Sequence, residues 1–271
     1  MMPARVIAID WSGSREEAAQ RRHIVAAEVW RGQVRLVTGL TRAAMIDWLT
    51  DVIQNEKKTV VGFDFSFSFP EDFFRTHNLK SVAALWQCVA KHGEEWLAIC
   101  PPPFWGRPGK KRPVPFPGEE LRQCEREISV GGIRPKSIYQ IGGAGAAGTG
   151  SLRGMPWLTR LRATGFSIFP FDVPAWPMAM EIYPRLLTGP VVKSSGPARS
   201  SFLDSEKFAA LCGSLRIPPE VLEQGKNSED AFDALVATLV MSRRRAEFAA
   251  LEAARSPREM LEGRVWGEAR D

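Results

Sequence analysis

The chain contains few of the residues that build zinc sites and disulfide frameworks: four cysteines and three histidines. The cysteines are Cys88, Cys100, Cys124 and Cys212. No two of them have C-x-x-C spacing, which argues against a Cys/His zinc site and predicts reduced thiols. Any metal site in this protein would therefore have to be built from carboxylates.

Long apolar runs are also missing, since no stretch approaches the 18 residues that would suggest a membrane span. The N-terminus reaches Asp10 too soon to hold a secretory signal, so we expect a cytoplasmic protein. Lys and Arg exceed Asp and Glu by only 36 to 31, a balance that permits an anionic partner without requiring one. The 271 residues, 44% hydrophobic, are those of an ordinary globular protein.

The first part of the chain predicts a sheet. Residues 6–10 form a buried strand that ends at Asp10, and residues 23–30 and 33–38 form a hairpin around Arg31-Gly32. A helix capped by Thr41 leads to a further strand over residues 58–64. A strand that follows a helical crossover is normally parallel to an earlier one, which would place Asp10 and Asp64 at the same sheet edge.

Residues 70–165 interrupt this plan as an insertion or a lid within a single domain of residues 1–271. The insertion contains a basic Pro/Gly-rich loop near Arg107–Arg112 and a glycine-rich stretch, residues 142–150, which we expect to be a loop. Gly143 to Gly148 match G-x-G-x-x-G, but the strand-turn-helix context of a dinucleotide site is absent. Backbone N–H groups that approach phosphate oxygens are a more plausible use of this stretch.

Two acids in the last helical pattern, Asp230 and Asp233, are three positions apart and therefore lie on one helix face. The helix continues with an apolar stretch, residues 235–241, which predicts that it is buried and carries its acids inward. Buried carboxylates need a positive partner, and a divalent metal would be one. Each acid also has an ordinary explanation: Asp10 could form a turn, Asp230 could favour a helix N-terminus, and Glu181 could lie on an exposed strand face.

Five segments of the chain form an ordered set: Ile7-Ala8-Ile9-Asp10-Trp11-Ser12-Gly13, Val61-Gly62-Phe63-Asp64-Phe65-Ser66, Pro135-Lys136-Ser137 with Gln140-Ile141-Gly142-Gly143-Ala144-Gly145, Glu181-Ile182-Tyr183-Pro184-Arg185, and Glu229-Asp230-Ala231-Phe232-Asp233-Ala234-Leu235. Together they resemble the family known as domain of unknown function 429, classed as predicted nucleases of the RNase H-like fold. The last segment is also similar to the final helix of RuvC-type resolvases. Those resolvases usually carry glutamate where this chain has Asp64.

The resemblance implies an α/β fold: a mixed five-stranded sheet of order 3-2-1-4-5, flanked by helices, with a large insertion after the fourth strand. It implies Asp10, Asp64, Asp230 and Asp233 as ligands of Mg²⁺ or Mn²⁺ and as catalytic residues, with Glu181 as a further catalytic candidate. The substrate-binding candidates are Lys136, Ser137, Gln140, Gly143, Gly145 and Arg185.

The leading hypothesis from these residues is a metal-dependent nuclease, because two metal ions held by carboxylates can stabilise both oxygens of a phosphoryl displacement. Whether its substrate would be DNA or RNA is left open. Two alternatives stay open: a phosphatase or phosphotransferase acting on a small nucleotide or metabolite, and a non-catalytic module that binds nucleic acid or protein.

Overall fold

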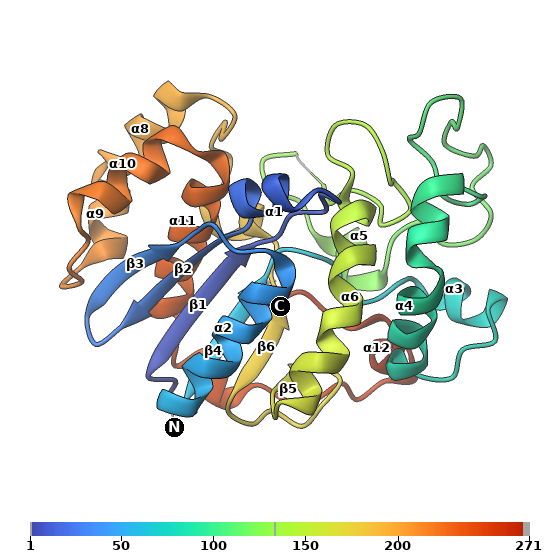
Figure 1. Cartoon of the computed structure of the whole chain (residues 1–271), viewed down its shortest axis with the longest axis horizontal. Coiled ribbons are helices and arrows are strands. Elements are labelled where there is room, and N and C mark those ends of the chain that lie inside the picture. Colours follow the sequence, from blue (N-terminus) through green and yellow to red (C-terminus); the bar gives the residue numbers. More distant parts are fainter. Residues whose placement is uncertain (1, 133, 268–271) are drawn as a thin grey trace.

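The computed structural model describes residues 2–132 and 134–267 and shows an α/β protein built around one sheet (Figure 1). The strands are β1 (Arg5–Asp10), β2 (Val25–Trp30), β3 (Gln33–Val37), β4 (Thr59–Phe63), β5 (Ser167–Phe169) and β6 (Met178–Glu181). The helices are α1 (Glu17–His23), α2 (Arg42–Asn55), α3 (Glu71–Thr76), α4 (Val82–Ile99), α5 (Gln123–Glu127), α6 (Ala147–Ala163), α7 (Pro184–Thr188), α8 (Gly196–Leu203), α9 (Glu206–Cys212), α10 (Pro219–Asn227), α11 (Glu229–Arg243) and α12 (Pro257–Glu262), with a 3₁₀ turn η1 (Glu247–Ala250).

The sheet is mixed, as expected, but it has six strands in the order β3-β2-β1-β4-β6-β5. The expected five-stranded order 3-2-1-4-5 was therefore wrong in its second half. The short strand β5 lies on the outer edge, and β6 takes the place beside β4 because its residues Met178 to Glu181 pair in parallel with Val60 to Phe63. The antiparallel hairpin β2-β3 and the parallel pairing of β1 with β4 are confirmed.

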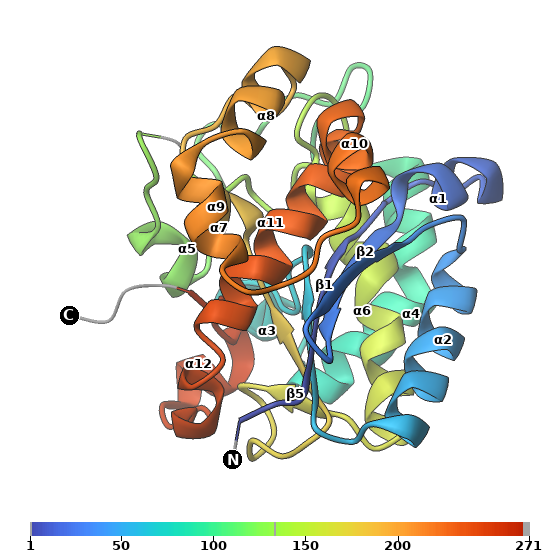
Figure 2. The same cartoon turned by 90° about the vertical axis from the view of Figure 1, so that its left-hand side faces the viewer.

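Helices cover both faces of the sheet (Figure 2). On one face α2, α4 and α6 pack against β1 side chains that include Ile7 and Ile9. On the other, α11 packs against Val6 and Ala8, the side chains that alternate with them. Because both faces of β1 are covered, the residues between its two charged ends, Val6 to Ile9, are all apolar. Residues 70–165 contribute to the first of these cores through α4 and α6, so their side chains share one packed interior with the sheet.

The glycine-rich stretch was expected to be a loop as far as residue 150, and this was wrong: α6 begins at Ala147. Its glycines permit close packing. A Cβ added to Gly148 would collide with the carbonyl oxygen of Ile138, and one added to Gly154 would lie 2.6 Å from the ring of Phe65. Likewise, a Cβ on Gly13 would lie 2.6 Å from the backbone nitrogen of Gly150. The small residues let the N-terminal half of α6 lie directly against the turn that follows β1.

No helix in the described part of the chain is long and apolar enough to cross a membrane.

Candidate active site

Two acids meet at the carboxyl edge of the sheet, where β1 and β4 end side by side. Asp10 is the last residue of β1 and Asp64 follows β4 directly. The backbone N–H of Asp64 donates to the carbonyl of Ile9 at 3.0 Å, which continues the parallel ladder by one residue and fixes the two acids as neighbours. The prediction that these strand ends are adjacent is confirmed.

Helix α11 brings Asp233 to the same edge. Ser228 caps the helix by accepting the N–H of Ala231 at 3.2 Å. Further along, the buried hydroxyl of Thr238 accepts the N–H of Ala8 and donates to the carbonyl of Ala27, both at 2.9 Å. These bonds fix the height of α11 on the sheet, and Asp233 is fully buried, at 0% exposure. The prediction that this apolar helix carries an acid inward is confirmed for Asp233.

Burial raises the pKa of all three carboxylates, and the charge of Asp233 raises those of Asp10 and Asp64 further. Burial is the largest cause of the raised pKa of Asp10, followed by the charges of Asp64 and Asp233. Burial also raises the pKa of Asp64 to about 7, against the opposing effect of the Lys193 ammonium. The pKa of Asp233 is raised by burial, although Lys193 lowers it. The site therefore concentrates negative charge in a position that favours a cation.

Lys193 is the cation that the chain itself supplies. Its ammonium forms an ion pair with Asp233 and lies 3.8 Å from a carboxylate oxygen of Glu229. Two arginines hold its loop: Arg185 donates to the carbonyls of Gly189 and Val191, and the buried Arg199 donates to the carbonyl of Lys193 itself. The nearby acids raise the pKa of Lys193, so this residue is charged at neutral pH.

We expect the raised pKa of Asp64 to make the metal-free protein less stable as pH rises. In the unfolded chain Asp64 loses its proton near pH 3.8, whereas the folded state holds the proton up to about pH 7. Between these values the folded state binds more protons, so the free energy of unfolding should fall by roughly 4 kcal/mol as the pH increases from below 3.8 to above 7. Urea unfolding in EDTA from pH 4 to pH 8 measures this change. Asp64→Asn, which mimics the protonated form, should flatten the curve, and identical curves would contradict the assignment.

The other two predicted acids have different surroundings. Asp230 lies at the more exposed start of α11, where its carboxylate is 2.8 Å from Nδ1 of His23, the last residue of α1. Glu181 is buried, at 4% exposure, so the alternative of an exposed strand face is wrong for it. Its carboxylate accepts two bonds from Arg122 and one from the N–H of Phe67 at 2.9 Å. These hydrogen bonds with Arg122 and Phe67 fix the position of the Glu181 carboxylate.

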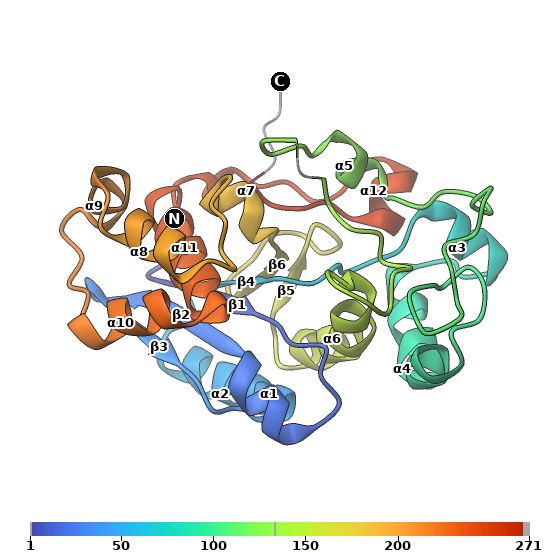
Figure 3. The same ribbon diagram turned by 90° about the horizontal axis from the view of Figure 1, so that it is seen from above.

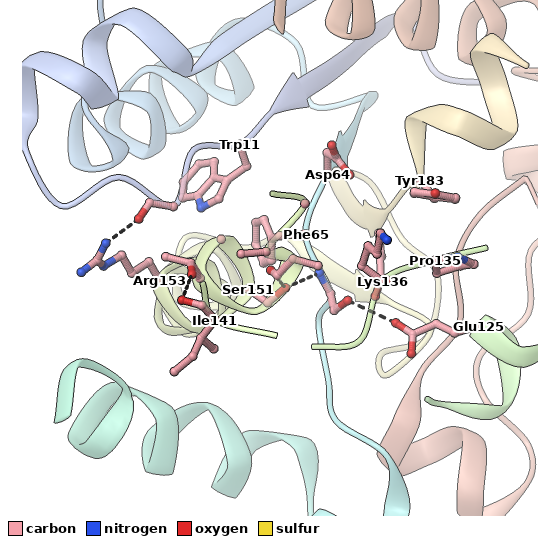
Figure 4. Close-up of a pocket in the computed structure, with 18 of the residues that line it drawn as sticks. Trp11, Asp64, Phe65, Glu125, Pro135, Lys136, Ile141, Ser151, Arg153 and Tyr183 are labelled. Carbon is pink, nitrogen blue, oxygen red and sulfur yellow. Dashed lines mark hydrogen bonds between the residues drawn. The ribbon is translucent and has the colours of Figure 1, made fainter. Parts of the chain in front are cut away.

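A pocket of about 640 Å³ adjoins the acids through Asp64 (Figure 4). Of the predicted substrate-binding residues, Lys136, Gly143 and Gly145 line it. Two others shape the loop beneath: Gln140 donates to the carbonyls of Gly142 and Ala144, and Ser137 donates to that of Glu120. Arg185 lies outside the pocket lining and holds the Lys193 loop instead.

Asp10, Asp64 and Asp233, together called the acid cluster, include one carboxylate oxygen that is available to coordinate a metal. Within the described residues, Oδ1 of Asp233 is buried and has no hydrogen-bond partner. Carboxylate oxygens are the ligands that Mg²⁺ and Mn²⁺ prefer. In the arrangement shown, however, no three His, Cys, Asp or Glu side chains among residues 2–132 and 134–267 form a metal-ligand group. The donor chemistry fits a divalent ion, but one of the donors, Asp233, is ion-paired with Lys193.

Sequence reasoning missed Lys193, Trp11 as a pocket residue, and Arg122. Lys193 follows an apolar pair in a Pro/Ser/Gly-rich segment and has no motif around it. Arg122 resembles any charged residue near a short helix, although it is fully buried. Of these three residues, only Trp11 could have been identified from the sequence, because it directly follows Asp10 within the first strand motif.

No protein-family model matches the chain, and no curated protein or solved structure is significantly similar to it.

Proposed function

We propose that this protein is a hydrolase of the RNase H-like fold that cleaves phosphodiester bonds in nucleic acid with Mg²⁺ or Mn²⁺. The observation that carries the proposal is the convergence of Asp10, Asp64 and Asp233 at the carboxyl edge of the sheet. These acids come from two strand ends and one buried helix far apart in the sequence. Gathering like charges in a buried position costs stability, and proteins accept that cost mainly at functional sites.

The sheet topology supports the fold part of the proposal. An antiparallel hairpin, β2-β3, flanks the central strand β1 on one side, and the parallel strands β4 and β6 lie on the other. This arrangement agrees with the family resemblance in its first four strands. Seen from above, the carboxyl end of β1 lies between α11 and the N-terminal part of α6 (Figure 3). The acids and the pocket thus share one edge of the molecule.

Asp10, Asp64 and Asp233 are the residues that would hold the metal, and Asp230 begins the same helix at the rim of the cluster. Bound there, the metal would supply the positive charge that stabilises the attacking and leaving oxygens of a phosphoryl displacement. Other residues of the chain compensate the charge of these acids and hold the surrounding backbone in place. Lys193 balances the charge of Asp233, while the framework around Glu181 and Arg122 keeps the end of β4 in place.

The test is cleavage of a labelled oligonucleotide, single-stranded and double-stranded, as DNA and as RNA. We expect cleavage with Mg²⁺ or Mn²⁺, its loss in EDTA because the carboxylates then repel the phosphate, and its return when excess metal is added. Cleavage that persists in EDTA would contradict the metal-dependent chemistry. No cleavage of any of the four substrates with either metal would contradict the proposal as a whole.

A second candidate activity, hydrolysis of a small phosphorylated molecule, is favoured by the pocket beside Asp64. Its volume, about 640 Å³, falls within the range of small-molecule sites, roughly 300–1,000 Å³. Turnover of a mononucleotide without cleavage of any polymer would favour this candidate over the nuclease.

A further inference from the structure

The pocket beside the acids contains a buried hydrogen-bond donor without a partner. Trp11 is only 6% exposed, and its indole Nε1–H has no acceptor among the described residues. The ring is fixed by Phe63 and Phe65, with centroid distances of 5.7 and 5.3 Å. Figure 4 shows the indole nitrogen on the side of the ring that faces α6 and the other lining residues. A buried N–H without a partner costs free energy, so this donor favours a ligand that brings an acceptor into the pocket.

The N-terminus of α6 points at the same space. Ala146, Ala147 and Gly150 line the pocket, and no side chain caps this 17-residue helix. Of its first N–H groups, that of Gly148 donates to the carbonyl of Gln140 at 3.0 Å. A helix N-terminus carries a partial positive charge and favours an anion.

Two cations without an ion-pair partner among the described residues also line the pocket. The side chain of Lys136 lies alongside Gly145, because a Cβ there would be 3.5 Å from its Cε, and it is on the Asp64 side of the pocket (Figure 4). Lys136 is exposed, and the described residues form no ion pair with its ammonium. Arg107 also lines the pocket, and its buried Nε has no partner in the described part of the chain. By contrast, Arg153 is bound to Glu94 at 2.7 Å and to the carbonyl of Gly13.

Two of the acidic lining residues are already compensated. Glu125 and Glu181 both form ion pairs with the buried Arg122. Asp64 marks the end of the pocket next to the proposed metal ligands, and Figure 4 shows Lys136 on the same side. The pocket therefore has a donor-rich end at Trp11, Arg107 and the N-terminus of α6, and a second end at Asp64 where chemistry would occur.

We infer that this pocket binds the phosphate monoester of a single nucleotide, with the phosphate held by the Trp11 indole N–H, the N-terminus of α6 and the Arg107 guanidinium. This inference rests on the proposed function for its chemistry but concerns a separate set of residues. Phosphate is the anion that uses all three kinds of donor, since its oxygens accept several charge-assisted hydrogen bonds. The remaining apolar lining, which includes Ile128 and Val265, suits a nucleoside. The phosphate belongs either to a free nucleotide or to the end of a nucleic-acid strand.

The test is calorimetric titration of full-length protein in EDTA with inorganic phosphate, adenosine 5′-monophosphate and adenosine. We expect the monophosphate to bind and adenosine to bind at least about tenfold more weakly. Trp11→Phe keeps the ring packing but removes the donor, and Arg107→Met keeps the stem but removes the charge. Each should weaken monophosphate binding about tenfold. The matched controls Trp48→Phe and Arg22→Met, outside the pocket, should bind like the wild type.

Short oligonucleotides with a 5′-phosphate or a 5′-hydroxyl then separate the two sources. A preference for the phosphorylated oligonucleotide identifies a strand end, and binding of the mononucleotide alone identifies a free nucleotide; either supports the inference. Equal binding of monophosphate and adenosine would overturn it, as would unchanged affinity in both folded variants by circular dichroism. Asp233→Asn separates this inference from the proposed function, because it should retain monophosphate binding even if no hydrolysis is ever detected. Hydrolysis with no effect of Trp11→Phe or Arg107→Met on binding would contradict the pocket inference alone.

Discussion

Replacing Asp10 by asparagine is expected to lower the rate of metal-dependent hydrolysis about 10³-fold while leaving the protein folded. Asp10 ends the central strand and is the acid whose pKa is raised by burial and then by the charges of Asp64 and Asp233. Asparagine has nearly the same shape but no charge, so it removes a ligand without leaving a cavity. Loss of several kcal/mol of charge stabilisation in the transition state corresponds to roughly a thousandfold or more in rate.

The measurement is the rate of oligonucleotide cleavage at saturating Mn²⁺, with folding checked by circular dichroism. Asp233→Asn should show a comparable loss, because Asp233 provides the buried oxygen without a partner. Asp51→Asn, an exposed acid on α2, is the matched control and should retain the wild-type rate. Full activity in a folded Asp10→Asn variant would exclude this acid from the chemistry. In EDTA the same variant should be at least as stable as the wild type, since it removes one of the repelling charges.

Replacing Arg122 by methionine is expected to lower the free energy of unfolding by about 3–5 kcal/mol. Arg122 is completely buried and donates to Glu181 and to Glu125, the latter at 2.8 Å. Burial alone would lower its pKa, but these two carboxylates more than offset that effect and raise the pKa well above its usual range. Without the guanidinium, two buried carboxylates have no counter-charge, which is the costly case for a buried ion pair.

Urea unfolding of the purified variant measures this loss. Adding Glu181→Gln to Arg122→Met should recover part of it, because one uncompensated charge is then removed, and a double-mutant cycle gives the coupling. The half-exposed pair of Arg126 with Glu119 serves as a control, and Arg126→Met should cost less than about 1 kcal/mol. A loss of similar size in both variants would mean that Arg122 contributes no more than a surface cation.

These two predictions distinguish acids that look alike in the sequence but have different surroundings in the structure. Asp233 has a buried carboxylate oxygen without a partner among the described residues, whereas both oxygens of the Glu181 carboxylate are bound by Arg122 or by the N–H of Phe67. The first arrangement favours a cation from outside the chain, and the second is already complete. Glu181 remains a candidate whose proposed catalytic role the same cleavage assay can test with Glu181→Gln.

The position of Lys193 gives the site a further property. An ammonium paired with Asp233 stabilises the cluster when no divalent ion is present, since it compensates a charge that burial would otherwise make costly. A metal ion that uses Asp233 therefore has to share or displace this lysine. Because Arg185 and Arg199 hold the backbone on either side of the loop, the lysine side chain is the part that can move most easily.

The sequence by itself determined the elements whose physics is local. Apolar runs ending at Asp10 and near Asp64, the Arg31-Gly32 turn and the Thr41 cap predicted the hairpin, α2 and the parallel pair β1-β4. The apolar pattern after Asp233 predicted a buried helix. These features depend on periodicity and on turn and cap chemistry, which a short segment carries within itself.

Only the tertiary structure decided the features that depend on distant partners. The placement of β6 between β4 and β5 follows from pairing across the sheet, and the helical state of residues 147–150 follows from glycines that admit the carbonyl of Ile138 and the Gly13 turn. Lys193 meets Asp233, Arg122 meets Glu181, and Trp11 faces α6 only because the chain returns to one edge of the sheet. Such contacts join residues tens to hundreds of positions apart. The stabilisation from these contacts depends on burial and charge where the two residues meet in the folded protein, and a short sequence pattern contains no information about that.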